Sequence, residues 1–112
     1  MRILVLLAAG WMLAGCSSGT PISVINQSDA PLEDVVVSGS GFSANVGLVQ
    51  PNAHVRVLVR PQGESDLRLH FNARGKTVSF GPDGYFEGGA GYVVTATVSP
   101  SLSVSVKSEL AR

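Results

Sequence analysis

The sequence predicts an all-β protein, a small antiparallel β-sandwich of about seven to eight strands that follows a cleaved N-terminal signal peptide. Two observations after Cys16 carry this prediction. Apolar and polar residues alternate repeatedly, and no stretch keeps apolar residues at helical spacing for three turns. Gly, Pro, Asn and Asp interrupt the alternation roughly every 8–12 residues, a spacing typical of sandwiches and small barrels. The 112 residues leave room for one such domain.

The first fifteen residues have the layout of an export signal. Arg2 precedes an apolar run from Ile3 to Ala14, and small residues follow directly before Cys16, the only cysteine of the chain. The run is shorter than the roughly 17–25 apolar residues that a transmembrane helix needs. The alternative is a buried N-terminal helix or strand. A polar face is missing from the run, so the export signal is the better interpretation.

Leu13-Ala14-Gly15-Cys16 resembles the lipobox of bacterial lipoproteins. The resemblance covers only this segment. It implies that the Cys16 thiol receives a diacylglycerol, that residues 1–15 are removed as a signal peptide, and that the new N-terminus is acylated. Residues 16–20 would then be the lipidated cysteine and a short polar tether. By the same resemblance, Ser17 in place of Asp suggests sorting to the outer membrane. The alternatives are a buried thiol, or ordinary cleavage that leaves Cys16 free.

The sandwich domain is expected over residues 21–107. Short apolar or alternating segments predict the first three strands around Ile22–Val24, Val35–Val37 and Phe42–Leu48. The next two segments are expected to form a hairpin, because an antiparallel register then sets apolar residues opposite apolar ones. That register pairs Val59 with Leu67, Val57 with Leu69 and Val55 with Phe71, and on the outer face Arg60 with Asp66, Arg56 with His70 and His54 with Asn72.

Four more strands are expected at 77–80, 85–87, 92–98 and 102–107, and residues 108–112 are expected to fray. Two architectures fit this number of strands, the immunoglobulin-like and the transthyretin-like sandwich. The buried tryptophan and the paired cysteines of true immunoglobulin domains are absent from the predicted domain. Only the architecture is therefore predicted, and the strand order stays open.

Composition and motifs indicate a protein that is not an enzyme and that uses no cofactor or metal. Eight basic residues balance eight acidic ones, so the chain lacks the basic excess typical of nucleic-acid binding. His54 and His70 are expected as diagonal neighbours on one outer face, but no cysteine or carboxylate nearby completes a metal site. The segment Gly88–Gly91 lacks the Lys-Ser or Lys-Thr and the helix of a phosphate-binding loop.

Three aromatic residues, Tyr85, Phe86 and Tyr92, flank the Gly88–Gly91 turn and form a candidate interaction patch. The alternative is that at least two of them pack in the core against Phe71 and Phe80. A second surface, with Arg56, Arg60 and Arg68 on the outer face of the expected hairpin, could orient the domain at an anionic membrane, but Glu64 and Asp66 dilute its charge and a solvated face is the better interpretation.

The sequence thus predicts a membrane-anchored, non-enzymatic lipoprotein of a bacterial cell envelope, held in the outer membrane by lipid on Cys16 and facing the periplasm. Its sandwich is expected to serve as a protein-interaction or assembly module for an envelope partner, without nucleic acid. The alternatives are a lipoprotein that binds a glycan or a lipid, and a periplasmic inhibitor or immunity protein.

Overall fold

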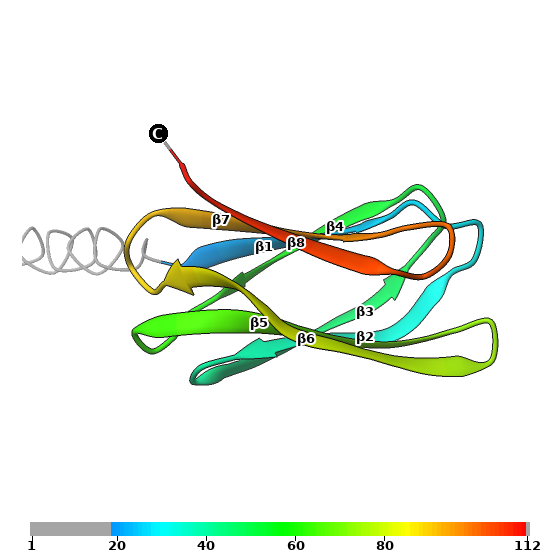
Figure 1. Cartoon of the computed structure of the whole chain (residues 1–112), viewed down its shortest axis with the longest axis horizontal. Helices are drawn as coiled ribbons and strands as arrows, with labels where there is room; N and C mark the ends of the chain where they lie inside the picture. The colour runs from blue at the N-terminus through cyan, green and yellow to red at the C-terminus, as the bar shows by residue number, and fades with distance from the viewer. Residues whose placement is uncertain (1–18, 112) are drawn as a thin grey trace, which may run out of the picture.

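A computed structural model describes residues 19–111, which form a two-layered β-sandwich (Figure 1). Within these residues every regular element is a strand, and none is a helix that could cross a membrane. The predicted fold class is therefore confirmed. The eight strands are β1 (Thr20–Asn26), β2 (Leu32–Gly39), β3 (Phe42–Val49), β4 (His54–Val59), β5 (Glu64–Ala73), β6 (Lys76–Glu87), β7 (Tyr92–Val98) and β8 (Val104–Leu110).

The strands form two sheets of four. Sheet I has the order β4-β1-β7-β8, and sheet II has the order β3-β2-β5-β6. All neighbours are antiparallel except β1 and β7, which run parallel. In an immunoglobulin domain the first two strands pair in one sheet. Here β1 and β2 lie in different sheets, so the strand order favours the transthyretin-like architecture of the two.

The core lies between the sheets and is built by strand alternation. Buried residues recur at every second position of the central strands β5 and β7, and the largest fully buried side chains of the sandwich are Phe71 of β5 and Phe86 of the edge strand β6. Fully burying a Val, Leu or Phe side chain contributes about 1.5–3 kcal/mol, so these contacts hold the two layers together. The fully buried core includes Ile22, Val24, Leu32, Val35, Val37, Val49, Leu67, Phe71, Phe86, Val94, Ala96 and Val98.

The predicted hairpin between 54–60 and 66–72 is wrong. Strand β4 pairs with β1, so that Val59 lies opposite Thr20 and Val57 opposite Ile22, while β5 pairs with β2 and β6. The inward faces were predicted correctly, because the valines of β4 and the apolar residues of β5 all pack against one core. Alternation specifies the face of a strand and leaves its partner open, and here the loop after Val59 crosses from sheet I to sheet II.

Three boundaries also differ from the predictions. Segments 77–80 and 85–87 belong to one strand, β6, whose pairing with β5 shifts register on both sides of Leu67. Strand β1 already begins at Thr20, inside the predicted tether. Strand β8 extends to Leu110, and Ser108, Glu109 and Leu110 pair with β7, so the frayed tail predicted for 108–112 is wrong for these three residues.

The sandwich has two ends. The proximal end is where β1 begins at Thr20, together with the β2–β3 turn and the β4–β5 and β6–β7 loops (Figure 1). The distal end holds the β1–β2, β3–β4, β5–β6 and β7–β8 connections. The two ends differ because the N-terminal segment joins the sandwich at the proximal end.

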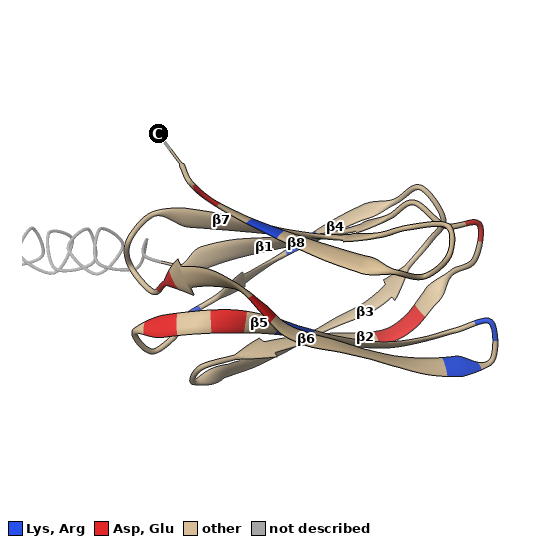
Figure 2. Cartoon of the chain, viewed as in Figure 1, with Lys and Arg blue, Asp and Glu red and all other residues tan. Residues whose placement is uncertain are grey.

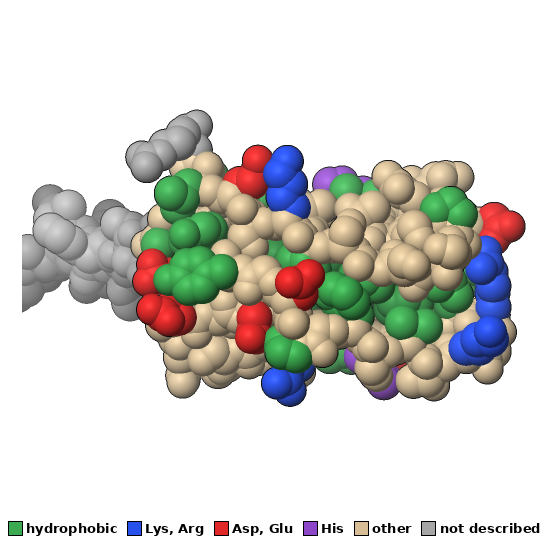
Figure 3. Space-filling model, viewed as in Figure 1, with side chains coloured by type: hydrophobic (Ala, Val, Ile, Leu, Met, Phe, Trp, Pro, Cys, Tyr) green, Lys and Arg blue, Asp and Glu red, His purple; other side chains and the backbone are tan. Residues whose placement is uncertain are grey.

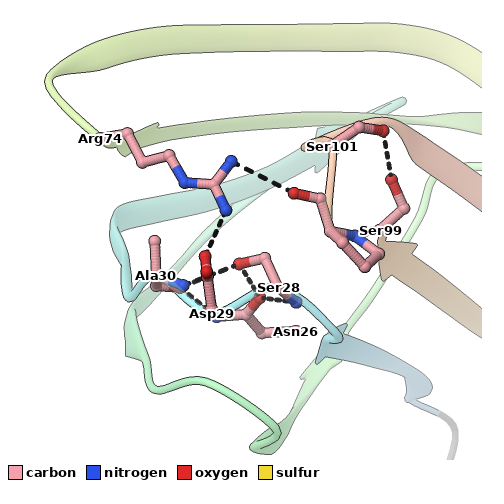
Figure 4. A network of polar contacts seen from close by, with 8 residues as sticks. Asn26, Ser28, Asp29, Ala30, Arg74, Ser99 and Ser101 are labelled. Carbon is pink, nitrogen blue, oxygen red and sulfur yellow. Dashed lines mark hydrogen bonds and ion pairs between the residues drawn. The ribbon is translucent and has the colours of Figure 1, made fainter.

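A polar network closes the distal end (Figure 4). The Asn26 side chain is fully buried: its Nδ2 donates to the carbonyl oxygens of Ala30 (2.8 Å) and Val49 (3.1 Å), and its Oδ1 accepts from the backbone N–H (2.9 Å) and hydroxyl (2.7 Å) of Ser28. Next to these buried hydrogen bonds, Arg74 forms an ion pair with Asp29 and donates to the carbonyl oxygen of Pro100 (3.2 Å). The network ties three connections together, and the buried Asn26 amide finds all its hydrogen-bond partners within the protein.

Candidate functional site

Two of the three residues of the predicted aromatic patch reach the surface. Tyr85 is 48% exposed, Tyr92 is partly buried, and their rings meet edge to face with centroids 6.2 Å apart. Phe86 is fully buried, with its ring 6.3 Å from that of Phe42. Its inclusion in the patch was therefore wrong. Successive strand residues point to opposite faces, so Tyr85 and Phe86 cannot both lie on one surface.

Carboxylates lie beside Tyr85 and were not among the site residues predicted from the sequence. Glu64 of β5 pairs directly with Glu87 of β6. Alternation places Asp66 on the same face of β5 as Glu64, and Tyr85 on the same face of β6 as Glu87. We call Tyr85, Tyr92, Glu64, Asp66 and Glu87 the tyrosine–carboxylate patch. Figure 3 shows hydrophobic side chains at the proximal end gathered beside acidic ones.

The electrostatics of the patch follow from this crowding. Partial burial, and after it the negative charges of Glu64 and Glu87, raise the pKa of the Tyr85 hydroxyl above its ordinary value. Like charges directly opposite each other on paired strands are destabilising. The Glu64–Glu87 pair therefore works against the fold at the place where it creates a negative field around an exposed aromatic ring.

A pocket of about 490 Å³ adjoins Tyr85 on the outer face of sheet II. Asp66 and Arg68 of β5 line it between the β2–β3 turn and β6. The Ser40 hydroxyl donates to the Gln62 carbonyl oxygen (3.1 Å), and the Ser65 hydroxyl donates to the Asp66 carbonyl oxygen (2.8 Å). The Ser65 hydroxyl also accepts from the backbone N–H of Ser40 (2.9 Å), so both hydroxyls hold the β2–β3 turn in place. The charged groups and the tyrosine remain for a ligand. The lining residues are Ser38, Gly39, Ser40, Glu64, Ser65, Asp66, Arg68, Gly84 and Tyr85.

Charge is distributed unevenly between the two sheets, as Figure 2 shows. The strands of sheet I carry Arg56 and Lys107 against Glu109. The strands of sheet II carry Arg68 and Lys76 against six acidic residues, namely Glu33, Asp34, Glu64, Asp66, Asp83 and Glu87. The patch therefore lies within the more acidic layer of a chain whose net charge is zero.

The two histidines do not come together. His54 lies on β4 in sheet I and His70 on β5 in sheet II, and both are exposed. The Nδ1 atom of His70 is 3.0 Å from the hydroxyl of Ser79, its register partner on β6. Among residues 19–111 no three His, Cys, Asp or Glu side chains gather as a metal site would require. Cys16, the predicted lipid attachment residue, lies outside the described residues.

Comparison with known proteins supports the fold and does not assign a function. No protein-family model and no curated protein matches the chain. An NMR structure of a protein from Eubacterium rectale is similar, with a TM-score of 0.56 over 86% of this chain and 93% of that chain. Because the two sequences are 17% identical, the similarity concerns the arrangement of the strands alone.

Proposed function

We propose that this chain is a non-enzymatic lipoprotein of a bacterial cell envelope, held in the outer membrane by lipid on Cys16 and facing the periplasm, whose sandwich binds a partner protein. The observation that carries the proposal is the sequence Leu13-Ala14-Gly15-Cys16, followed after only three residues by the first strand of a folded domain. An export signal, a modifiable cysteine and a compact module in immediate succession are what an anchored binding domain requires.

The tether sets the position of the domain. Ser17, Ser18 and Gly19 span at most about 10–11 Å when fully extended. A single acyl chain anchors only marginally, whereas two or more chains hold a protein stably. With lipid on Cys16, the proximal end of the sandwich and its tyrosine–carboxylate patch would therefore lie close to the membrane surface.

A binding role fits the described side chains better than catalysis does. His70 and Ser79 form the one contact that resembles a base and a nucleophile, but both are register partners within the regular β5–β6 pairing and neither lines the pocket beside Tyr85. An acyl-transfer site also needs donors aimed at a developing oxyanion. The exposed tyrosine and the uneven charge are instead features of a recognition surface.

Replacing Cys16 tests the anchor. The variant Cys16→Ser is expected to lose incorporation of radiolabelled palmitate and either to leave the membrane fraction or to remain unprocessed. Ser18→Ala, a neighbouring change of similar size, is the control and should fractionate as the wild type does. The acyl mass on the N-terminal peptide, measured by mass spectrometry, gives a second readout. A Cys16→Ser protein that migrates and fractionates like the wild type would rule out the lipoprotein assignment.

Capture of partners tests the binding role. Crosslinking in living cells, followed by affinity capture of the anchored protein, is expected to recover one reproducible envelope protein. An inhibitor or immunity role would be indicated if that partner were a hydrolase or a toxin whose activity falls on binding. A lipidated protein that is repeatedly recovered alone would contradict the protein-binding role.

A glycan-binding lipoprotein is the second candidate, and the pocket beside Tyr85 is the observation that favours it. Binding sites for small ligands are concave and combine an aromatic surface with a few polar groups. Titration with soluble cell-wall fragments, followed by NMR shifts of residues that line the pocket, would detect such binding. Shifts confined to those residues, without any captured protein, would favour the glycan.

A further inference from the structure

We propose that the tyrosine–carboxylate patch binds a lysine- or arginine-bearing segment of the partner protein. The inference rests on the proposed binding role and adds the surface and the chemistry of the partner. The patch combines a half-exposed tyrosine ring with three carboxylates on one face of sheet II, beside a pocket of about 490 Å³. These groups come from β5 and β6, and Tyr92 of β7 contacts the Tyr85 ring at the proximal end.

The Glu64–Glu87 pair is the first step of the argument. Two carboxylates directly opposite each other weaken the β5–β6 pairing. Neither of them takes part in an ion pair, because the two ion pairs among residues 19–111 join Arg74 to Asp29 and Lys107 to Glu109. Departures from local rules of stability are expected at functional sites. A bound cation would relieve the repulsion, so the pair is better suited to the complex than to the free protein.

Tyr85 supplies the second step. A lysine or arginine side chain over a tyrosine face is attracted by the ring, and nearby carboxylates strengthen the attraction. Tyr92 holds the Tyr85 ring edge to face at 6.2 Å, which limits the positions that the ring can take. Arg68 lines the part of the pocket beyond Asp66 on the same face of β5. The positive group of the ligand is therefore expected on the side of Glu64 and Glu87.

The position of the patch argues against a lipid surface as its occupant. Aromatic side chains near a membrane often settle at the headgroups. Here three carboxylates flank the tyrosine, and an anionic membrane surface repels them. A basic segment of a protein at the same membrane level meets no such repulsion. Charge complementarity thus favours the protein over the lipid.

Peptide binding to the full-length, processed protein in neutral detergent tests the proposal. The probe is a fluorescent peptide of alternating Lys and Gly, and its counterpart has Glu in place of Lys. Anisotropy is expected to report binding of the lysine peptide only, weakening as salt rises because screening shortens the range of the charges. Binding of both peptides with equal affinity, or affinity that does not respond to salt, would overturn the proposal.

Variants locate the binding. Glu87→Gln is expected to weaken the lysine peptide about two- to fivefold, the range of one partly exposed ion pair. Tyr85→Ala is expected to weaken it about fivefold, whereas Tyr85→Phe keeps the ring and the affinity. The matched control is Glu33→Gln, the same change on the exposed face of β2 outside the patch, which should leave affinity unchanged. If Glu33→Gln weakens binding as much as Glu87→Gln does, the attraction is general and the site is not this patch.

Two further readouts keep the outcomes separate. Thermal unfolding of Glu87→Gln is expected at the same or a higher temperature than the wild type, because the like-charge pair is removed, so a loss of affinity will not be a loss of folding. Binding of the protein to vesicles of phosphatidylglycerol that requires Tyr85 would overturn the choice of a protein ligand. If the protein carries palmitate on Cys16 but binds neither peptide, this inference is refuted and the lipoprotein proposal stands. If the protein binds the lysine peptide but carries no palmitate, the lipoprotein proposal is refuted and this inference stands.

Discussion

Asn26 is the buried polar residue on which the distal end of the sandwich depends most. Its side chain is 0% exposed and makes four hydrogen bonds, two to carbonyl oxygens and two from Ser28. A buried polar group left without its partner costs about 1–3 kcal/mol. Asn26→Ala is therefore expected to lower the free energy of unfolding by about 2–4 kcal/mol, measured by urea denaturation.

An exposed asparagine gives the comparison for this variant. Asn45 lies on the outer face of edge strand β3, and Asn45→Ala should stay within about 0.5 kcal/mol of the wild type, as surface substitutions usually do. If Asn26→Ala unfolds at the same urea concentration as Asn45→Ala, the network is not a source of stability.

The Asp29–Arg74 pair makes stability depend on acid pH. The hydrogen bond from Arg74, and after it the Arg74 charge, lower the pKa of the Asp29 carboxyl below its ordinary value. A carboxyl whose pKa is lower in the folded state contributes stability above its unfolded pKa, near pH 4, and this contribution is lost as pH falls through the folded pKa. NMR titration is expected to show the Asp29 pKa rise in Arg74→Asn.

The choice of asparagine keeps the turn intact. Arg74 and Gly75 both have positive φ, 52° and 72°, and connect Ala73 to Lys76 as the central residues of a two-residue hairpin turn. Asn-Gly is the sequence that such turns favour. An Asp29 pKa that does not move in Arg74→Asn would mean that the ion pair does not form in solution.

At the same scale, the composition of the patch was only partly predictable. Tyr85 and Phe86 are adjacent in the sequence, and alternation alone excludes that both face solvent. The same rule places Glu87 beside Tyr85 once β6 is known to continue through these residues. The contribution of Glu64 was not predictable, because it depends on a register with β6 that irregular pairing shifts twice.

Strand β8 is an element that the sequence suggested only in part. Its last residues, Ser108–Leu110, alternate less clearly than Val104–Val106, yet they pair with Val94, Val93 and Tyr92. Ala111 adds a backbone hydrogen bond to Gly91 (2.8 Å). Removal of residues 108–112 is therefore expected to lower the free energy of unfolding by about 1–3 kcal/mol, since several ladder bonds contribute roughly 0.5–1.5 kcal/mol each.

Glu109→Gln is the control for this truncation. It removes the exposed ion pair with Lys107 (3.4 Å) and leaves the backbone pairing in place. Exposed pairs contribute about 0–1 kcal/mol, so this variant should unfold nearly as the wild type does. A truncated protein as stable as Glu109→Gln would show that β8 ends earlier than Leu110.

At the level of elements, the sequence predicted which residues form strands and which face of each strand is buried, but not which strands pair. The alternation of Val55, Val57 and Val59 identified β4 and its inward face correctly. It could not identify β1 as the partner, because in a sandwich the strands of both sheets direct apolar residues into the same core. A four-residue loop, 60–63, is compatible with a hairpin and with a crossing between sheets.

At the scale of the whole molecule, fold and charge place the patch at the end where the chain enters the domain. Thr20 begins β1 at the proximal end (Figure 1), and Tyr85, Tyr92 and their carboxylates lie at the strand ends next to the β4–β5 and β6–β7 loops of the same end. With lipid on Cys16, as proposed, the short tether would hold this end near the membrane and give it a high local concentration toward a partner at the same level. The length of the tether is therefore part of the proposed binding mechanism.

Lengthening the tether tests this arrangement. An insertion of about 20 Gly and Ser residues between Ser18 and Gly19 reaches roughly 25 Å on average and lowers the local concentration at the membrane. The unfolding temperature and the membrane fractionation are expected to stay unchanged, because the insertion precedes β1 and follows Cys16. The yield of crosslinks from a photoreactive residue at position 85 to a membrane-bound partner is expected to fall several-fold. An unchanged crosslink yield would mean that the partner is not fixed at the membrane surface, because only crosslinking to a partner held there depends on the length of the tether.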